Sequence, residues 1–178
     1  VTQNVSVPVC IYDNPGTTHF TFTDELHGRL SSLEGVRSVK IPGVPNTQAA
    51  ATERVHALRQ HLRPGVTIGI SGDAYAGLGL NAGCEVWYSV CGGLFPQMAK
   101  QITEAAAAND HERVTALTTR LEPLWSLFHK HGGSIRVIAA AAGLLGLTDM
   151  DCLPRPLQPL SAGNIADIAH VISTLELK

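Results

Sequence analysis

Short apolar runs alternate with longer amphipathic segments along the first half of the chain. Each run is rich in β-branched residues and is followed by a turn or a glycine, which is typical of strands. Between the runs, Thr23 can cap a helix over residues 23–33. A second helix is predicted over 47–61, before Arg-Pro-Gly, and a short one within 72–83 that ends at a glycine. Strands that alternate with helices predict an α/β fold with a parallel sheet. The four predicted strands cover residues 7–12, 36–40, 66–71 and 84–90.

The pattern changes after residue 95, where strand-like runs give way to helical periodicity. A proline-rich connection, LPRPLQPL, interrupts this second half and precedes a helix that Ser161 can cap. The chain therefore consists of four β/α units and an all-helical continuation. The helices predicted in this continuation cover residues 96–108, 111–131, 135–147 and 161–178.

Four β/α units fit two architectures. A doubly wound dinucleotide-binding sheet needs a glycine-rich loop directly after a strand, but GLGLNA begins several residues beyond the third strand. A (β/α)8 TIM barrel takes about 250 residues, so this chain would supply its second half. We predict the C-terminal half of such a barrel over residues 1–95, and its last helix with a C-terminal helical segment over 96–178. The missing N-terminal half is expected before Val1 or from another chain.

Composition narrows the classes of partner. The chain has 178 residues, 44% of them hydrophobic, and a net charge of −2, which disfavours nucleic acid and anionic membranes. Its apolar stretches are shorter than a membrane span and no signal peptide opens it, so a cytoplasmic location is expected. The cysteines Cys10, Cys84, Cys91 and Cys152 lack metal-ligand spacing and are interpreted as buried free thiols. No metal or other cofactor is predicted.

Two polar side chains end consecutive predicted strands. Tyr12 closes the first run before Asp-Asn-Pro-Gly, and Lys40 closes the second before Ile-Pro-Gly. Carboxyl ends of parallel barrel strands meet at one mouth, where a partly desolvated lysine amine can attack a ketone and a tyrosine hydroxyl can transfer protons. Alternatively, Lys40 extends to solvent and Tyr12 is a half-buried aromatic. The pair by itself does not decide between these readings.

Four motifs in order extend the pattern around this pair. They are VPVCIYDNPGTT, then VRSVKIPG with Lys40 28 positions after Tyr12, then ISGD, and then the strand CEVWYSV. Together they resemble the dihydrodipicolinate synthase / N-acetylneuraminate lyase family of class I aldolases. The resemblance implies that Lys40 forms a Schiff base with pyruvate or a related 2-oxo acid, with Tyr12 as the catalytic tyrosine. It further implies a substrate-binding set of Thr17, Thr18, Gly72, Asp73 and Tyr88, with the backbone around Tyr88 lining the site.

The resemblance also bears on assembly and specificity. It implies a homotetramer or dimer, and it assigns further substrate-binding groups to the missing first half, so this chain alone is expected to be inactive. Dihydrodipicolinate synthases carry an arginine five residues after the catalytic tyrosine, which binds the carboxylate of aspartate semialdehyde. Thr17 stands there and offers no bidentate positive group. We therefore expect a Schiff-base lyase, synthase or dehydratase that is not a dedicated enzyme of lysine biosynthesis.

Some alternatives stay open on the sequence. The chain could be a non-catalytic relative that binds an oxo acid or builds an oligomer. Asp73 could hold a backbone amide or cap a helix. His19 is expected to be exposed, and Arg136 is explained by packing and solvation although it could bind a carboxylate.

Overall fold

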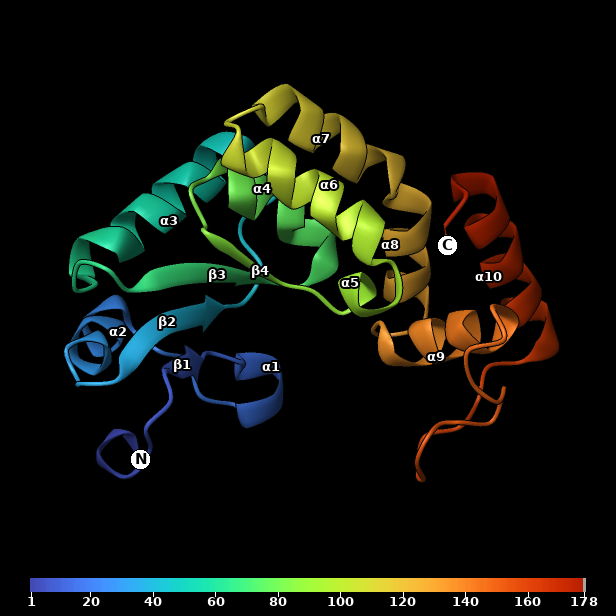
Figure 1. The fold of residues 1–178 in the computed structure, drawn as a ribbon, viewed down its shortest axis with the longest axis horizontal. Coiled ribbons are helices and arrows are strands. Elements are labelled where there is room, and N and C mark those ends of the chain that lie inside the picture. The colour runs from blue at the N-terminus through green and yellow to red at the C-terminus, as the bar shows by residue number, and fades with distance from the viewer. Residues whose placement is uncertain (178) are drawn as a thin grey trace.

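The four predicted strands form one parallel sheet. The computed structural model describes residues 1–177, and its strands are β1 (Val9–Tyr12), β2 (Val36–Ile41), β3 (Thr67–Ser71) and β4 (Val86–Tyr88). They lie side by side in chain order, and all three pairs are parallel (Figure 1). Among the described residues the sheet is open, with β1 and β4 at its edges. The prediction that this chain does not close a barrel alone is confirmed.

β4 is shorter than predicted because the backbone at both of its ends bonds elsewhere. The amide of Cys84 donates to the Gly79 carbonyl at 3.0 Å and so completes the preceding helical turn. The amide of Val90 donates to the Asp73 carboxylate at 3.1 Å. Neither amide is left for a strand ladder, and the apolar character of residues 84–90 gives no sign of this.

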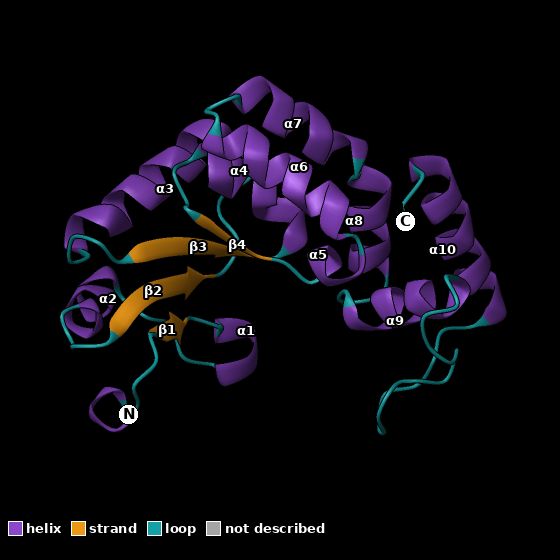
Figure 2. Cartoon of the chain, viewed as in Figure 1, coloured by secondary structure: helices purple, strands orange, loops and turns teal. Residues whose placement is uncertain are grey.

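Helices cover one face of the sheet, here called the outer face (Figure 2). They are α2 (Asp24–Ser31), α3 (Gln48–His61) and α4 (Ala76–Asn81), with a 3-10 turn η2 (Asp73–Tyr75) before α4. Thr23 and Thr47 cap α2 and α3 by accepting bonds from the amides of Leu26 and Ala50, as such residues do at helix starts. The core between these helices and the sheet includes Val39, Ile41, Val55, Leu58, Ile68 and Ile70.

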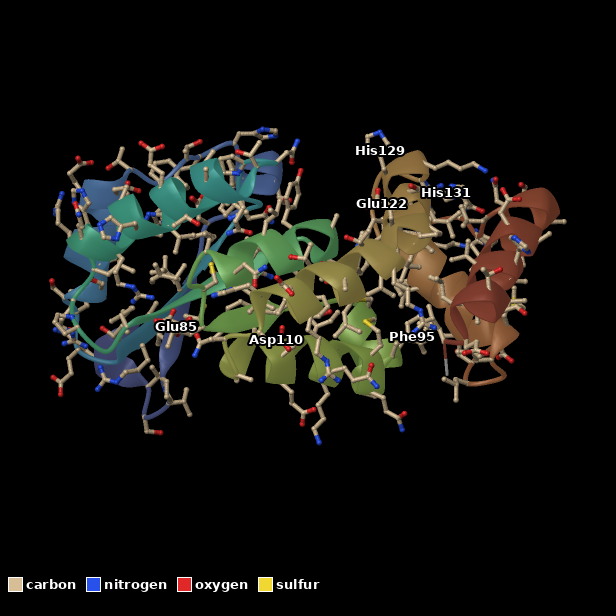
Figure 3. All side chains as sticks on the ribbon, turned by 90° about the horizontal axis from the view of Figure 1, so that it is seen from above. Glu85, Phe95, Asp110, Glu122, His129 and His131 are labelled. Carbon is tan, nitrogen blue, oxygen red and sulfur yellow. The ribbon has the colours of Figure 1, made fainter. Side chains whose placement is uncertain are left out.

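Within residues 1–177, six helices follow the sheet and build the C-terminal segment. They are α5 (Cys91–Leu94), α6 (Pro96–Ala107), α7 (His111–Arg120), α8 (Glu122–Lys130), α9 (Ile135–Leu144) and α10 (Ala162–Leu175). A short helix precedes β1, η1 (Thr2–Asn4), and another follows it, α1 (Pro15–Thr18). The C-terminal helices have their own core, with Phe95, Ile102, Val114, Leu124, Val137 and Ile168 almost fully buried. In Figure 3, Glu85 lies beside the sheet. Glu122 and His129 lie in α8 and His131 directly after it, on the side of the molecule nearer to α10.

Some predicted helix bounds were wrong. The single helix predicted over 111–131 is divided at Leu121, because Pro123 in the first turn of α8 has no amide hydrogen with which to continue the helix. α9 ends at Leu144 rather than at residue 147, and Gly146, just beyond its end, adopts a positive φ of 71°, which is typical of helix ends. The boundary proposed between residues 95 and 96 stays a prediction.

The prediction of four buried thiols was wrong for two of them. Cys84 and Cys91 are buried, and burial raises the pKa of the Cys84 thiol to about 12. Cys10 and Cys152 are exposed. Cys10 alternates onto the uncovered face of β1, and Cys152 lies in the connection between α9 and α10. No helix within residues 1–177 combines the length and apolar content of a membrane span.

Candidate active site

Alternation along the strands places polar groups on the face opposite the outer helices, here called the inner face. Strand residues two apart share a face, so Tyr12 and Lys40 face inward while Ile11, Val39 and Ile41 pack outward. The parallel register sets Tyr12 beside Lys40 and Lys40 beside Gly69. The sheet therefore brings the two predicted catalytic residues to one level on neighbouring strands.

The Lys40 amine lies directly against the Tyr12 ring. The Nζ atom is 3.8 Å from the ring centroid, a distance at which an ammonium group is attracted to an aromatic face. The amide of Asp13 donates to the Lys40 carbonyl at 2.9 Å and fixes the two strand ends relative to each other. Lys40 is half-buried and Tyr12 is 46% exposed. The Lys40 side chain is thus partly accessible on the uncovered inner face.

Tyr88 approaches the same amine from β4. Its ring centroid is 5.5 Å from the Lys40 Nζ, and its hydroxyl donates to the Ser38 hydroxyl at 2.9 Å. Burial raises the pKa of the Tyr88 phenol above its ordinary value, and the neighbouring Cys10 thiol adds to the rise. The phenol is therefore a neutral hydrogen-bond donor at physiological pH. The inner face thus carries a lysine between two tyrosine rings.

Asp73 holds the backbone that follows Tyr88. The residue is 6% exposed, and its carboxylate accepts hydrogen bonds from the Trp87 indole at 3.1 Å and from the amides of Val90 and Cys91 at 3.1 and 2.9 Å. Gly72 precedes it with a φ of 80°, a conformation that L side chains rarely adopt. The interpretation of Asp73 as a group that holds backbone amides is confirmed, whereas substrate contacts of Gly72 and Asp73 stay predictions.

Thr17 and Thr18 lie in α1, above the end of β1, and both are exposed. The Thr17 hydroxyl accepts a hydrogen bond from the Asn14 side chain at 3.0 Å, and the Thr18 hydroxyl donates to the Asn14 carbonyl at 3.0 Å. These bonds tie the turn to itself. The Thr18 hydroxyl is committed to the turn, so a substrate role is better suited to Thr17, and both roles stay predictions.

Tyr75 packs against the outer-face core close to the predicted site residue Gly72, and sequence reasoning missed it. A Cβ atom on Gly43 would lie 2.5 Å from the Tyr75 ring, and one on Gly72 would lie 3.1 Å from it. The ring therefore fits between the glycines that follow β2 and β3. The glycine in each of these loops was the available signal, because a glycine after a strand often permits close approach.

Two other residues considered from the sequence have structural explanations. His19 is exposed and adopts a left-handed conformation with a φ of 56° at the end of α1. Arg136 is half-buried and donates to the His131 carbonyl at 2.9 Å. The expectation that His19 is exposed is confirmed, and the contact of Arg136 agrees with its interpretation as a packing residue.

A buried histidine and a buried aspartate lie behind the Tyr12 strand end. His27 is fully buried and stacks on Phe22 with ring centroids 5.1 Å apart. Its Nε2 atom is 3.9 Å from Oδ2 of Asp13, and both ring nitrogens lack hydrogen-bond partners within residues 1–177. Burial lowers the pKa of His27, and Asp13 opposes this. Sequence reasoning missed the pair because nothing in the spacing of the two residues indicates that they meet.

We expect the His27 pair to make stability depend on pH. The pKa of His27 is lower in the folded than in the unfolded protein, where it is about 6.5. The free energy of unfolding is therefore highest above about pH 6.5. It decreases as the pH falls toward the folded pKa, because the unfolded protein binds a proton on His27 before the folded protein does. Urea unfolding should show a falling midpoint between about pH 7 and pH 5, and His27→Phe, which keeps a stacking ring, should flatten that slope. A ring-proton titration of His27 with a midpoint above 6.5 would contradict the prediction.

Comparison with known proteins places the chain in a family. The sequence profile of the Dihydrodipicolinate synthetase family matches residues 1–175. The chain belongs to the dihydrodipicolinate synthetase family. It is 28% identical over 174 residues to the 4-hydroxy-tetrahydrodipicolinate synthase of Rickettsia rickettsii, an alignment that covers 97% of this chain and 56% of that enzyme. The resemblance inferred from the four motifs is confirmed.

Solved structures of the family agree with the fold. The dihydrodipicolinate synthase of Agrobacterium tumefaciens superposes with a TM-score of 0.88 at 39% identity, over 96% of this chain and 56% of that one. The enzyme from Acinetobacter baumannii, solved with pyruvate, superposes with a TM-score of 0.82 at 18% identity, over 99% of this chain and 58% of that one. This chain therefore spans about half the length of the relatives it matches, and its α/β fold corresponds to about half of their TIM barrel.

Proposed function

We propose that this chain supplies the Schiff-base half of an aldolase-type active site that acts on pyruvate or a related 2-oxo acid. In this proposal other strands, from the same or another chain, close the barrel; the complete assembly is called the closed-barrel protein below. The observation that carries the proposal is the Lys40 amine, 3.8 Å from the Tyr12 ring at the ends of adjacent parallel strands. Homo-oligomerisation as a dimer or tetramer, and a cytoplasmic location, are part of the same proposal.

The chemistry follows from the two side chains. The Lys40 ammonium first gives up a proton to solvent, and the neutral amine then adds to the ketone carbon. The proton that the nitrogen loses on addition moves to the carbonyl oxygen, which gives a carbinolamine. Loss of that oxygen as water leaves a protonated imine, which withdraws electrons from the adjacent carbon. The Tyr12 hydroxyl can donate a proton to the departing oxygen and recover one from the solvent. An adjacent carbon–carbon or carbon–oxygen bond can then form or break.

The family relatives support this substrate class. The Acinetobacter baumannii enzyme was solved with pyruvate bound, and the Rickettsia rickettsii relative is named for its synthase reaction. The alternative is a relative of the same fold that binds an oxo acid or forms an oligomer without catalysis. The two proposals differ in whether a covalent bond to Lys40 forms.

Reductive trapping separates them. Pyruvate and then borohydride added to the closed-barrel protein should reduce the imine and leave the three-carbon acid on Lys40, where peptide mass spectrometry will locate it. Lys100 and Lys130 serve as internal controls, because they lie in α6 and α8 and form ion pairs with Glu104 and Asp167. Label on another lysine, or none, would favour the non-catalytic alternative.

Thr17 predicts poor use of aspartate semialdehyde. A threonine lacks the charged, bidentate donor that a guanidinium offers to a carboxylate. Steady-state assays of the closed-barrel protein with pyruvate and aspartate semialdehyde should give a kcat/KM below about 10⁴ M⁻¹s⁻¹. Thr17→Arg should raise it about tenfold or more, and Thr17→Gln, which is long but uncharged, should not. A wild-type value above that limit would overturn the prediction.

A further inference from the structure

Gly69 is a glycine because of a neighbouring ring rather than because of its own backbone. It lies within β3 and does not belong to the glycines with positive φ. A Cβ atom built on it would lie 2.2 Å from Cε2 and 2.6 Å from Cδ2 of Tyr88. No real side chain approaches that closely, so any residue with a Cβ would displace the ring. Gly69 also pairs with Lys40 in the register, so the space left by the missing side chain of Gly69 lies beside the lysine.

The other end of the Tyr88 side chain is fixed as well. Its hydroxyl donates to Ser38 at 2.9 Å, and the Ser38 hydroxyl is 2.9 Å from that of Thr67. Ser38 is 9% exposed and lies two residues before Lys40, on the same face and one level deeper in the sheet. The Tyr88 hydroxyl therefore lies at the level of Ser38, one level deeper in the sheet than Lys40. The Tyr88 ring lies between Ser38 and the Lys40 amine.

The two constraints determine where the Lys40 side chain can go. The Lys40 Nζ is 3.8 Å from the Tyr12 ring and 5.5 Å from the Tyr88 ring, so in its protonated form, before it loses a proton and attacks, it is attracted to both aromatic faces. Gly69 offers no side chain against which it could pack instead. A flexible four-carbon side chain thus has one preferred position, beside Tyr12.

We propose that Tyr88 is a positioning residue: its ring, seated over Gly69 and anchored by Ser38, holds the Lys40 amine toward Tyr12 for attack on the substrate carbonyl. This inference rests on the proposed function, because positioning matters only if Lys40 is the nucleophile. It assigns Gly69 and Tyr88 as a matched pair in which the small residue makes room for the large one. Ser38 is the third member, since it fixes the rotation of the ring.

The rate of reductive trapping on Lys40 tests this role in the closed-barrel protein. Tyr88→Leu removes the ring and should lower the maximum trapping rate about tenfold or more, while the pyruvate concentration for half-maximal rate changes less than about threefold. Tyr88→Phe keeps the ring and loses only the bond to Ser38, so it should recover most of the rate. Ser38→Ala removes the same bond and also the contact with Thr67, so it should be no faster than Tyr88→Phe, and the two substitutions combined should be no slower than Ser38→Ala alone.

Gly69→Ala provides the reciprocal test. The added methyl group should displace the ring and slow trapping about as much as Tyr88→Leu. Gly69→Ala combined with Tyr88→Leu should be no worse than Tyr88→Leu alone, because the methyl group then has no ring to displace. If Gly69→Ala does not fold, the Tyr88 and Ser38 variants decide the matter.

The outcomes separate this inference from the proposed function. Wild-type protein labelled on Lys40, together with Tyr88→Leu labelled at the wild-type rate, would overturn the role of Tyr88 and leave the proposed function intact. Failure of Tyr88→Phe to recover the rate lost in Tyr88→Leu would also overturn the positioning role. Wild-type protein that takes no label on Lys40 would overturn the proposed function itself.

Discussion

Lys40→Ala abolishes both pyruvate trapping and turnover in the closed-barrel protein, as we expect from its place on the inner face. The loss should be at least about 10³-fold, because removal of a covalent nucleophile leaves only binding and electrostatic assistance. Lys40 is the lysine that lies against the two inner-face rings, whereas Lys100 is exposed on α6. Initial rates and the mass of the reduced adduct measure the effect.

Two variants serve as controls for this prediction. Lys100→Ala removes a lysine with a surface ion pair and should leave trapping and turnover unchanged. Tyr12→Phe keeps the ring against Lys40 and removes the hydroxyl, so slow trapping should persist while turnover falls about 10²-fold or more. Retained turnover in Lys40→Ala would require the aldolase proposal to be withdrawn in favour of the non-catalytic alternative.

The order of elements was predictable because local signals agree with the final packing. The apolar runs at β1 to β3 carry their outward residues into one core with α3, and Thr23 makes the expected capping bond at the start of α2. The ends of β4 and the break at Leu121 were not predicted correctly. The end of β4 depends on a hydrogen bond to Asp73, which is distant in the sequence, and the break at Leu121 depends on the amide hydrogen that Pro123 lacks. Neither feature changes the hydrophobic pattern.

The candidate site divides in the same way. Lys40 and Tyr12 end strands that neighbour each other in the sequence, so parallel register was sufficient to bring them together. The contact between Gly69 and Tyr88 and the one between Asp13 and His27 join residues whose spacing follows no motif. A glycine inside a strand was the only available signal for the first, and the second had none.

The buried carboxylate of Asp73 supports the second large effect that we expect. Asp73→Ala leaves three donors without an acceptor: the Trp87 indole and the amides of Val90 and Cys91. A buried donor without a partner costs about 1–3 kcal/mol. The bond from the Cys91 amide is buried and the other two are partly buried, so the loss of unfolding free energy should be about 3 kcal/mol. Urea unfolding should show the loss as a lower midpoint with little change in slope.

The same substitution should also affect the site, because Asp73 joins the end of β3 to the backbone that follows Tyr88. Without that link the Tyr88 ring loses its support from the loop, and trapping on Lys40 should slow even at temperatures where the variant is fully folded.

Asp149→Ala is the matched control, since Asp149 is exposed and lies between α9 and α10, and surface substitutions of this kind change stability by less than about 0.5 kcal/mol. Asp73→Asn should be intermediate, because the amide keeps one acceptor oxygen but turns an NH₂ group toward the remaining donors. If Asp73→Ala unfolds at the same urea concentration as Asp149→Ala, the three hydrogen bonds do not contribute to stability and the loop after β4 must be held by the packing of Trp87 and Cys91 alone.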